Sequence, residues 1–226
     1  MAGTAHLARL TGLELYGAKL SDADIELLAA SAHVAGLTDL RLGLNRISPL
    51  GVETLARSPF LTRLTRLHLL DNPLGDAGMR ALAAWSGVRN LAILQVLRTK
   101  VGSPGVQALA ASPYLAGLRT LELDGNALGS EAVEALASSH YMTGLRRLSL
   151  NHCQLSDAAA VALARSPNFA VLEELNLEEN AIGPAGAEAL AASPHLSRLH
   201  HLNLVRNPVE TAHRRLCARF GDHVYL

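Results

Sequence analysis

The stretch Leu118–Leu128 reads LRTLELDGNAL, and its pattern recurs along the chain at a fixed spacing. The third residue after each opening leucine is again leucine in every copy, and the fifth is leucine except at Val96. No insertion or deletion interrupts the series, so the chain is predicted to stack copies of one supersecondary unit. The opening leucines stand 27 residues apart, at Leu10, Leu37, Leu64, Leu91, Leu118, Leu145, Leu172 and Leu199.

Each copy is expected to contain one strand and one helix. Apolar residues three and five places after the opening leucine alternate with variable residues, which is the period of a strand with one buried face. Gly or Ser follows, and apolar residues then recur with helical spacing, as at Val133, Leu136 and Ala137. Ser-Pro pairs such as Ser112-Pro113 end the helices, because proline disfavours helical conformation in the preceding residue.

A single strand and helix cannot bury their apolar faces, whereas stacked copies can. Because the helix side is wider than the strand side, the stack is expected to curve. An asparagine eight residues after the opening leucine is predicted to bond the buried backbone in the bend after each strand. Thr99 and Cys153 can replace it in part, and Ala18 cannot. The asparagines are Asn45, Asn72, Asn126, Asn180 and Asn207.

The combined pattern LxxLxLxxNxL and GxxGxxALAxSPxL resembles the leucine-rich repeats of the ribonuclease-inhibitor-like class, from about Leu7 to the C-terminus. The strict 27-residue spacing and the closing RRLCARFGDHVYL resemble multi-copy bacterial members, in which a separate N-terminal domain often precedes the repeats. The resemblance implies an α/β leucine-rich repeat solenoid, a curved right-handed horseshoe. Its parallel sheet would line the concave face and its short helices the convex face.

We expect a single repeat domain over residues 1–226. Residues 1–9 are interpreted as the end of a partial repeat, 10–198 as seven full 27-residue repeats, and 199–226 as a final strand and C-terminal cap. No N-terminal cap is recognisable, so Leu13, Leu15 and Leu28 are expected to be poorly covered. Two hypotheses follow: the chain is a fragment of a longer protein, or the uncapped N-terminal end self-associates.

Charge and hydropathy exclude several classes of partner. Twenty Lys and Arg balance twenty Asp and Glu, which argues against general nucleic-acid binding. The apolar residues come in short runs, never the roughly 18 consecutive ones of a membrane span. The first residues lack the pattern of a secretory signal, so a cytoplasmic location is expected.

No catalytic motif is found in the sequence. GxGxxG, GxxxxGK(S/T), HExxH, GxSxG and paired CxxC are missing. Cys153 and Cys217 are more than two repeats apart, too far for a disulfide, and the histidines are spread too widely to share a metal ion. We therefore expect no enzymatic activity, no catalytic residue, no metal and no cofactor.

The variable strand residues that face away from the core are the predicted site for a protein partner. An apolar strip with an Arg-rich rim is typical of protein interfaces. We define the apolar strip as Tyr16, Leu44, Leu70, Ile93 and Leu97; its rim is Arg41, Arg66, His68 and Arg98, with Gln95 between them. The acidic zone comprises Glu122, Asp124, Glu174, Glu178 and Glu179.

The leading hypothesis is a non-enzymatic recognition scaffold that binds a protein through this concave face. GTPase-activating proteins for Ran-type GTPases are similar in fold, which makes a regulator of that kind the alternative. A third hypothesis is a repeat module of a longer protein whose activity lies elsewhere.

Overall fold

A computed structural model describes residues 10–226 of the chain. Within this range nine parallel strands form one sheet, in the order of the chain. Partner residues on neighbouring strands are 27 positions apart, as Leu13 and Leu40 are, except in the last pair of strands, where Leu202 pairs with Val224. The strands are β1 Gly12–Glu14, β2 Asp39–Arg41, β3 Arg66–His68, β4 Ile93–Gln95, β5 Thr120–Glu122, β6 Arg147–Ser149, β7 Glu174–Asn176, β8 His201–Asn203 and β9 Val224–Tyr225.

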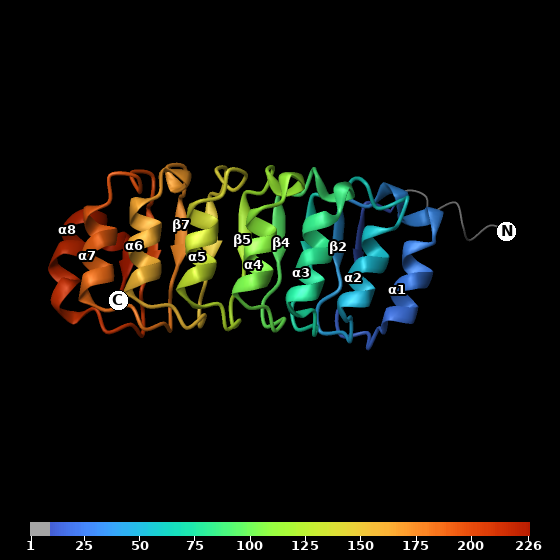
Figure 1. Cartoon of the computed structure of the whole chain (residues 1–226), viewed down its shortest axis with the longest axis horizontal. Coiled ribbons are helices and arrows are strands. Elements are labelled where there is room, and N and C mark those ends of the chain that lie inside the picture. The colour runs from blue at the N-terminus through green and yellow to red at the C-terminus, as the bar shows by residue number, and fades with distance from the viewer. Residues whose placement is uncertain (1–9) are drawn as a thin grey trace.

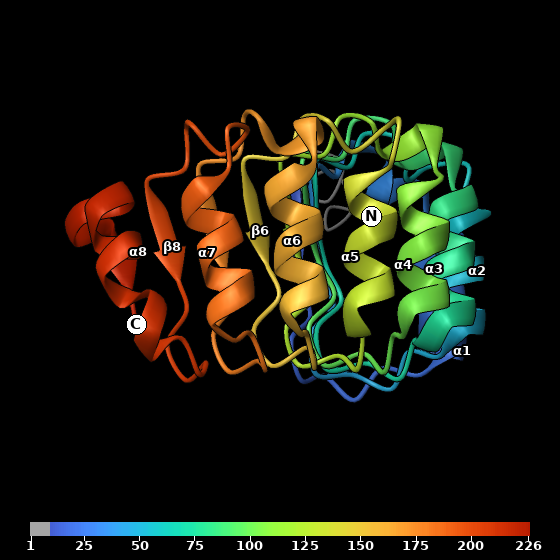
Figure 2. The ribbon, with the colours of Figure 1, turned by 60° about the vertical axis from the view of Figure 1, so that its left-hand side comes forward.

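A helix follows each of the first eight described strands, and the helices cover one face of the sheet (Figure 1). Figure 2 shows the array bending so that the helices lie outside and the strands inside. The predicted α/β leucine-rich repeat solenoid is therefore confirmed. The helices are α1 Asp22–Ala29, α2 Pro49–Ala56, α3 Gly75–Ala84, α4 Ser103–Ala110, α5 Gly129–Ala137, α6 Asp157–Arg165, α7 Pro184–Ala192 and α8 His213–Phe220.

One apolar core runs the length of the solenoid. The paired strand leucines Leu40, Leu67 and Leu94 are fully buried between the sheet and the helices. At the N-terminal end Leu13, Leu15 and Leu28 are only partly buried, as predicted from the sequence. The partial repeat predicted at residues 1–9 lies outside the described residues.

The asparagines eight residues after the opening leucines form a column along the solenoid, the asparagine column, and they bond buried backbone as the sequence predicts. Asn126 accepts hydrogen bonds from the backbone N–H groups of Thr99 (3.0 Å) and Val101 (3.1 Å). Its amide donates to the carbonyls of Val96 (2.9 Å) and Leu123 (2.7 Å). One side chain thus bonds buried backbone in its own repeat and in the one before, and fixes how the two stack.

Two aspartates, Asp76 and Asp157, link neighbouring repeats at helix starts through contacts that were not predicted from the sequence. Asp76 of α3 accepts hydrogen bonds from the N–H groups of Gly102 (2.7 Å) and Gly105 (3.1 Å), at the start of α4. Asp157 makes the same pair with Gly183 and Gly186. A Cβ on Gly105 would lie 2.7 Å from the Asp76 carboxylate, so this position requires glycine. Each such carboxylate caps the next repeat's helix.

The residues after β8 form one α-helix and one short strand. Helix α8 ends at Phe220, and Gly221 follows it with a φ of 59°, in the left-handed region that glycine tolerates. Strand β9 then pairs in parallel with β8 and completes the sheet.

Candidate protein-binding surface

The strand residues that face away from the helices form an open surface on the concave side of the sheet. Tyr16 and Leu44, from the apolar strip, are 49% and 47% exposed. Leu70, Ile93 and Leu97 are partly exposed on the strands that follow. A Cβ on Gly43 would lie 2.7 Å from the Tyr16 ring and 3.0 Å from Leu70, so glycine lets these two side chains close over it.

In each described repeat, the residue just before the asparagine position has a left-handed backbone, also where another residue replaces the asparagine. Gly17 and Gly125 occupy it with φ of 64° and 68°. Leu44 adopts the same conformation, with φ of 54°. For a residue with a side chain this conformation costs about 1 to 2 kcal/mol. The other residues in this column are Asp71, Arg98, His152, Glu179 and Arg206.

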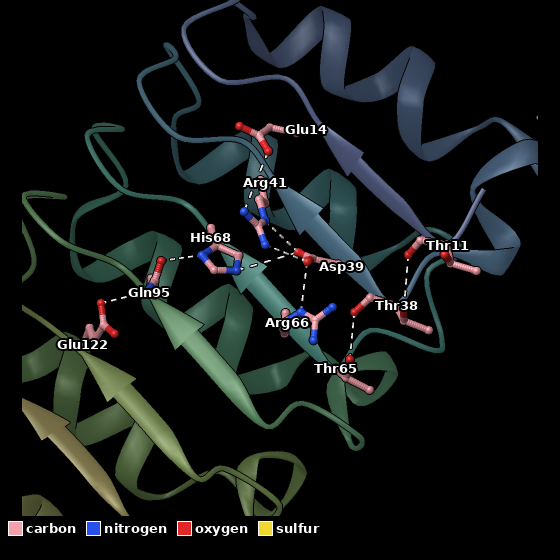
Figure 3. A network of polar contacts seen from close by, with 10 residues as sticks. All are labelled: Thr11, Glu14, Thr38, Asp39, Arg41, Thr65, Arg66, His68, Gln95 and Glu122. Atoms are coloured by element: carbon pink, nitrogen blue, oxygen red, sulfur yellow. Dashed lines mark hydrogen bonds and ion pairs between the residues drawn. The ribbon is translucent and has the colours of Figure 1, made fainter. Parts of the chain in front are cut away.

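The Arg-rich rim is organised around a buried carboxylate, Asp39. Arg41 donates two hydrogen bonds to Asp39, from Nε (3.2 Å) and Nη2 (3.0 Å). Arg66 on the next strand donates to it from Nε (2.9 Å), and His68 Nε2 lies 3.7 Å from it. Figure 3 shows the three side chains converging on Asp39. Burial raises the Asp39 pKa, but the hydrogen bonds from Arg41 and Arg66 outweigh it and hold the pKa below its ordinary value.

A chain of polar contacts leads from this cluster to the acidic zone. The Nδ1 atom of His68 contacts the side-chain oxygen Oε1 of Gln95, and Nε2 of Gln95 donates to Glu122 (2.8 Å) (Figure 3). Among residues 10–226, His68 Nε2 is buried without a hydrogen-bond partner. Asp39, His68, Gln95 and Glu122 thus connect four neighbouring strands across the face.

The acidic zone contains two carboxylates that lie outside its ion pairs. Arg147 pairs with Glu174 (2.9 Å), and Arg206 lies near Glu178 (4.0 Å) and Glu179 (3.6 Å). Glu122 and Asp124 are largely covered and make no ion pair within the part of the chain that the structure describes. Burial raises the pKa of both carboxyl groups, and their mutual repulsion raises that of Glu122 further. They border a hollow of about 330 Å³ lined by Glu122, Asp124, Arg147, Leu148, Ser149, Glu174, Asn176, His201 and Asn203.

Replacing Glu122 by glutamine is expected to raise the stability of the protein at pH 7. The raised pKa means that the fold favours the neutral acid, so the wild-type protein itself gains stability as the pH falls through that pKa. The advantage of Glu122→Gln should therefore shrink on acidification and vanish below the ordinary glutamate pKa of 4.5. Urea unfolding of both proteins between pH 7 and pH 4 measures it. Glu174→Gln, which removes the partner of Arg147, serves as the control and should give no gain at pH 7.

The structure thus groups the predicted site residues more tightly than their order in the sequence suggests. Arg98 is held by Asp71 through Nε (2.8 Å), just as Arg41 and Arg66 are held by Asp39. Neither Asp39 nor Asp71 was among the site residues predicted from the sequence. The signal that could have found them is an acid and an arginine one repeat apart, as in Asp39 and Arg66 or Asp71 and Arg98.

The described residues offer little else that resembles a reactive site. Cys153 is buried, and burial raises its thiol pKa to about 12, which suits a core residue rather than a nucleophile. In residues 10–226, no three His, Cys, Asp or Glu side chains are grouped as metal ligands would be. The same range contains no helix with the length and hydropathy to cross a bilayer.

An open parallel sheet with helices along its outer face defines a solenoid repeat protein. The family described as Leucine Rich repeat matches five segments of the chain, residues 37–56, 61–83, 118–137, 142–164 and 170–191. These five segments are leucine-rich repeats, and the sheet and helices that contain them form a leucine-rich repeat solenoid.

A similar solved structure is that of internalin C2 from Listeria monocytogenes. The alignment covers 99% of this chain and 82% of that one, with 22% identity and a TM-score of 0.58. At this identity the likeness concerns the fold alone. No curated protein matches the sequence.

Proposed function

We propose that this leucine-rich repeat protein is a non-enzymatic scaffold that binds a protein partner through the apolar strip and its rim on the concave face. Its helical repeats support placement in the ribonuclease-inhibitor-like class. No contact in the described residues favours the GTPase-activating alternative. A cytoplasmic location stays a prediction.

The observation that carries the proposal is Leu44. Its side chain is half exposed to water, and its backbone has a conformation that glycine adopts at two equivalent positions. The left-handed bend recurs at this position in the described repeats, where the other residues are glycine, polar or charged, so the feature particular to Leu44 is its exposed apolar side chain. Exposure of an apolar side chain is unfavourable in the isolated protein. A partner that covers Leu44 would compensate for that exposure.

Changing Leu44 to glycine should separate stability from recognition. Glycine adopts the left-handed backbone without strain, which stabilises the folded state, but it also gives the unfolded chain more conformational freedom. The free energy of unfolding should therefore stay equal or rise by up to about 1 kcal/mol. Partner affinity should fall about tenfold, because an apolar side chain that the partner would bury is lost. Urea unfolding gives the first quantity. Titration of the partner isolated on the immobilised wild-type chain gives the second.

The control is Leu27→Ala. Leu27 lies on α1, on the convex face, and is 76% exposed. This variant removes a comparable exposed leucine from a surface that the proposal leaves free, so affinity should not change. A clear loss of stability in Leu44→Gly, with affinity unchanged, would assign Leu44 to the fold and contradict the proposal.

A further inference from the structure

We infer that the partner segment bound over β1–β4 is acidic as well as apolar, and that it presents a carboxylate to Arg66 and Arg41 while its apolar side chains cover the strip. The inference rests on the proposed function and adds the chemistry of the partner. It follows from how Asp39 holds the two arginines, from the donors they have left over, and from the charges on the rest of the face.

Asp39 fixes the directions of both guanidinium groups. Its carboxylate is buried and holds Arg41 through two nitrogens and Arg66 through Nε. The side chains of Arg41 and Arg66 stay 45% and 47% exposed. The negative charge therefore lies beneath the surface and the positive charges above it. Side chains held in this way lose little freedom when a ligand binds.

The two guanidinium groups of this cluster have more N–H donors than the Asp39 carboxylate accepts from. One buried carboxylate faces two guanidinium groups. Within the described residues, the two terminal nitrogens of Arg66 have no hydrogen-bond or ion-pair partner, and Nη1 of Arg41 has only the exposed Glu14, at 3.7 Å. A guanidinium with both terminal nitrogens free matches the two oxygens of a carboxylate. The nearest group that could compete, Glu14, lies on the far side of Arg41 from Arg66 (Figure 3).

The apolar strip lies within reach of the same ligand. Arg66 and Leu70 belong to one chain segment four residues apart, or about 13 Å at 3.3 Å per extended residue. Neighbouring strands add about 4.8 Å each. A peptide about four to six residues long can therefore contact Leu44 or Leu70 at one end and Arg66 at the other.

The other half of the face rejects the same partner. The acidic zone holds five carboxylates against Arg147 and Arg206, and two of its carboxylates are already partly desolvated. An acidic segment moved from β2 and β3 to β5–β7 would meet repulsion. Charge thus gives the partner one preferred position along the solenoid, with its acidic part over Arg66.

The test is a selection of random dodecapeptides displayed on phage against the immobilised full chain. Enriched peptides should combine apolar residues with Asp or Glu. A synthetic peptide from the selection should bind Arg66→Gln about tenfold more weakly than the wild type, as expected for loss of a charged, two-pronged contact. Its own Glu→Gln analogue should lose a similar factor, and the two losses should not add.

Arg147→Gln is the matched control. Arg147 occupies the same strand position as Arg66, three strands further on, and is also exposed, but it pairs with Glu174 of the acidic zone. It should leave the affinity within about twofold of the wild type. Thermal melts of both variants check that the fold persists, and in Arg66→Gln the pair between Arg41 and Asp39 remains to hold the carboxylate.

The possible outcomes separate the two proposals. Peptides that lose binding in Leu44→Gly, yet carry no acidic residue or ignore Arg66→Gln, would overturn the inference and leave the proposed function in place. Peptides that bind Leu44→Gly as well as the wild type would contradict the proposed function itself. Selection of basic peptides sensitive to Glu122→Gln, or of no binder at all, would also overturn the inference, because a preformed site of this kind should capture a short acidic segment.

Discussion

Replacement of Asn126 by alanine is expected to lower the free energy of unfolding by about 3 to 5 kcal/mol. The variant leaves the buried N–H groups of Thr99 and Val101 without the oxygen that accepts from them. It also removes the amide donor to the carbonyls of Val96 and Leu123, which then keep only the Thr99 hydroxyl and the Cys153 thiol as side-chain donors. Each unsatisfied buried group costs about 1 to 3 kcal/mol, and relaxation or an entering water offsets part of that sum. Urea unfolding followed by circular dichroism measures the loss.

The chain itself supplies an intermediate variant. Thr99 occupies the asparagine position in the preceding repeat, and its hydroxyl donates to the Val96 carbonyl (2.7 Å). Asn126→Thr should therefore keep one of the four bonds and lose less stability than Asn126→Ala. A loss below about 1 kcal/mol in Asn126→Ala would show that the asparagine column contributes little to the stacking of the repeats.

The fold could be predicted from the sequence because each of its causes repeats every 27 residues. Leu121 and Leu123 alternate with Glu122 and Asp124, which indicates a strand with one buried face. Val133 and Leu136 show the buried side of the helix, and Asn126 shows the bend between them. In each case local patterning and the buried surface agree, so the prediction needed no knowledge of side-chain contacts.

The details of the concave face depend on contacts between repeats, which patterning does not reveal. Arg41 and Arg66 both reach Asp39 because their rotamers converge on one carboxylate from two strands. The burial of Glu122 and Asp124 likewise comes from neighbouring side chains, although their positions predicted an exposed acidic surface. The left-handed backbone at Leu44 could not be seen either, because leucine itself gives no sign of it.

The double variant Leu70→Asp/Leu97→Asp should abolish partner binding, with a loss of about a hundredfold or more. Both leucines belong to the apolar strip and lie on neighbouring repeats, so the variant places two carboxylates in the centre of the proposed interface. A charge enclosed there without a partner loses its hydration, at a cost of several kcal/mol that the complex cannot recover. An acidic partner would also be repelled. Titration with the purified partner measures the loss.

Leu27→Asp on the convex face is the control, because it adds a carboxylate to an exposed leucine outside the strip. Affinity should be unchanged in this variant and lost in the double variant, while both keep the circular dichroism of the wild type. If the double variant is too unstable to compare, Leu44→Gly reports on the same surface without adding charge. Undiminished recovery of the partner by the double variant would place the binding surface elsewhere. Equal losses of affinity in Leu27→Asp and in the double variant would instead indicate that the partner also contacts the helices. The buried core separates α1 from the concave face, so a charge at Leu27 cannot act on the apolar strip directly.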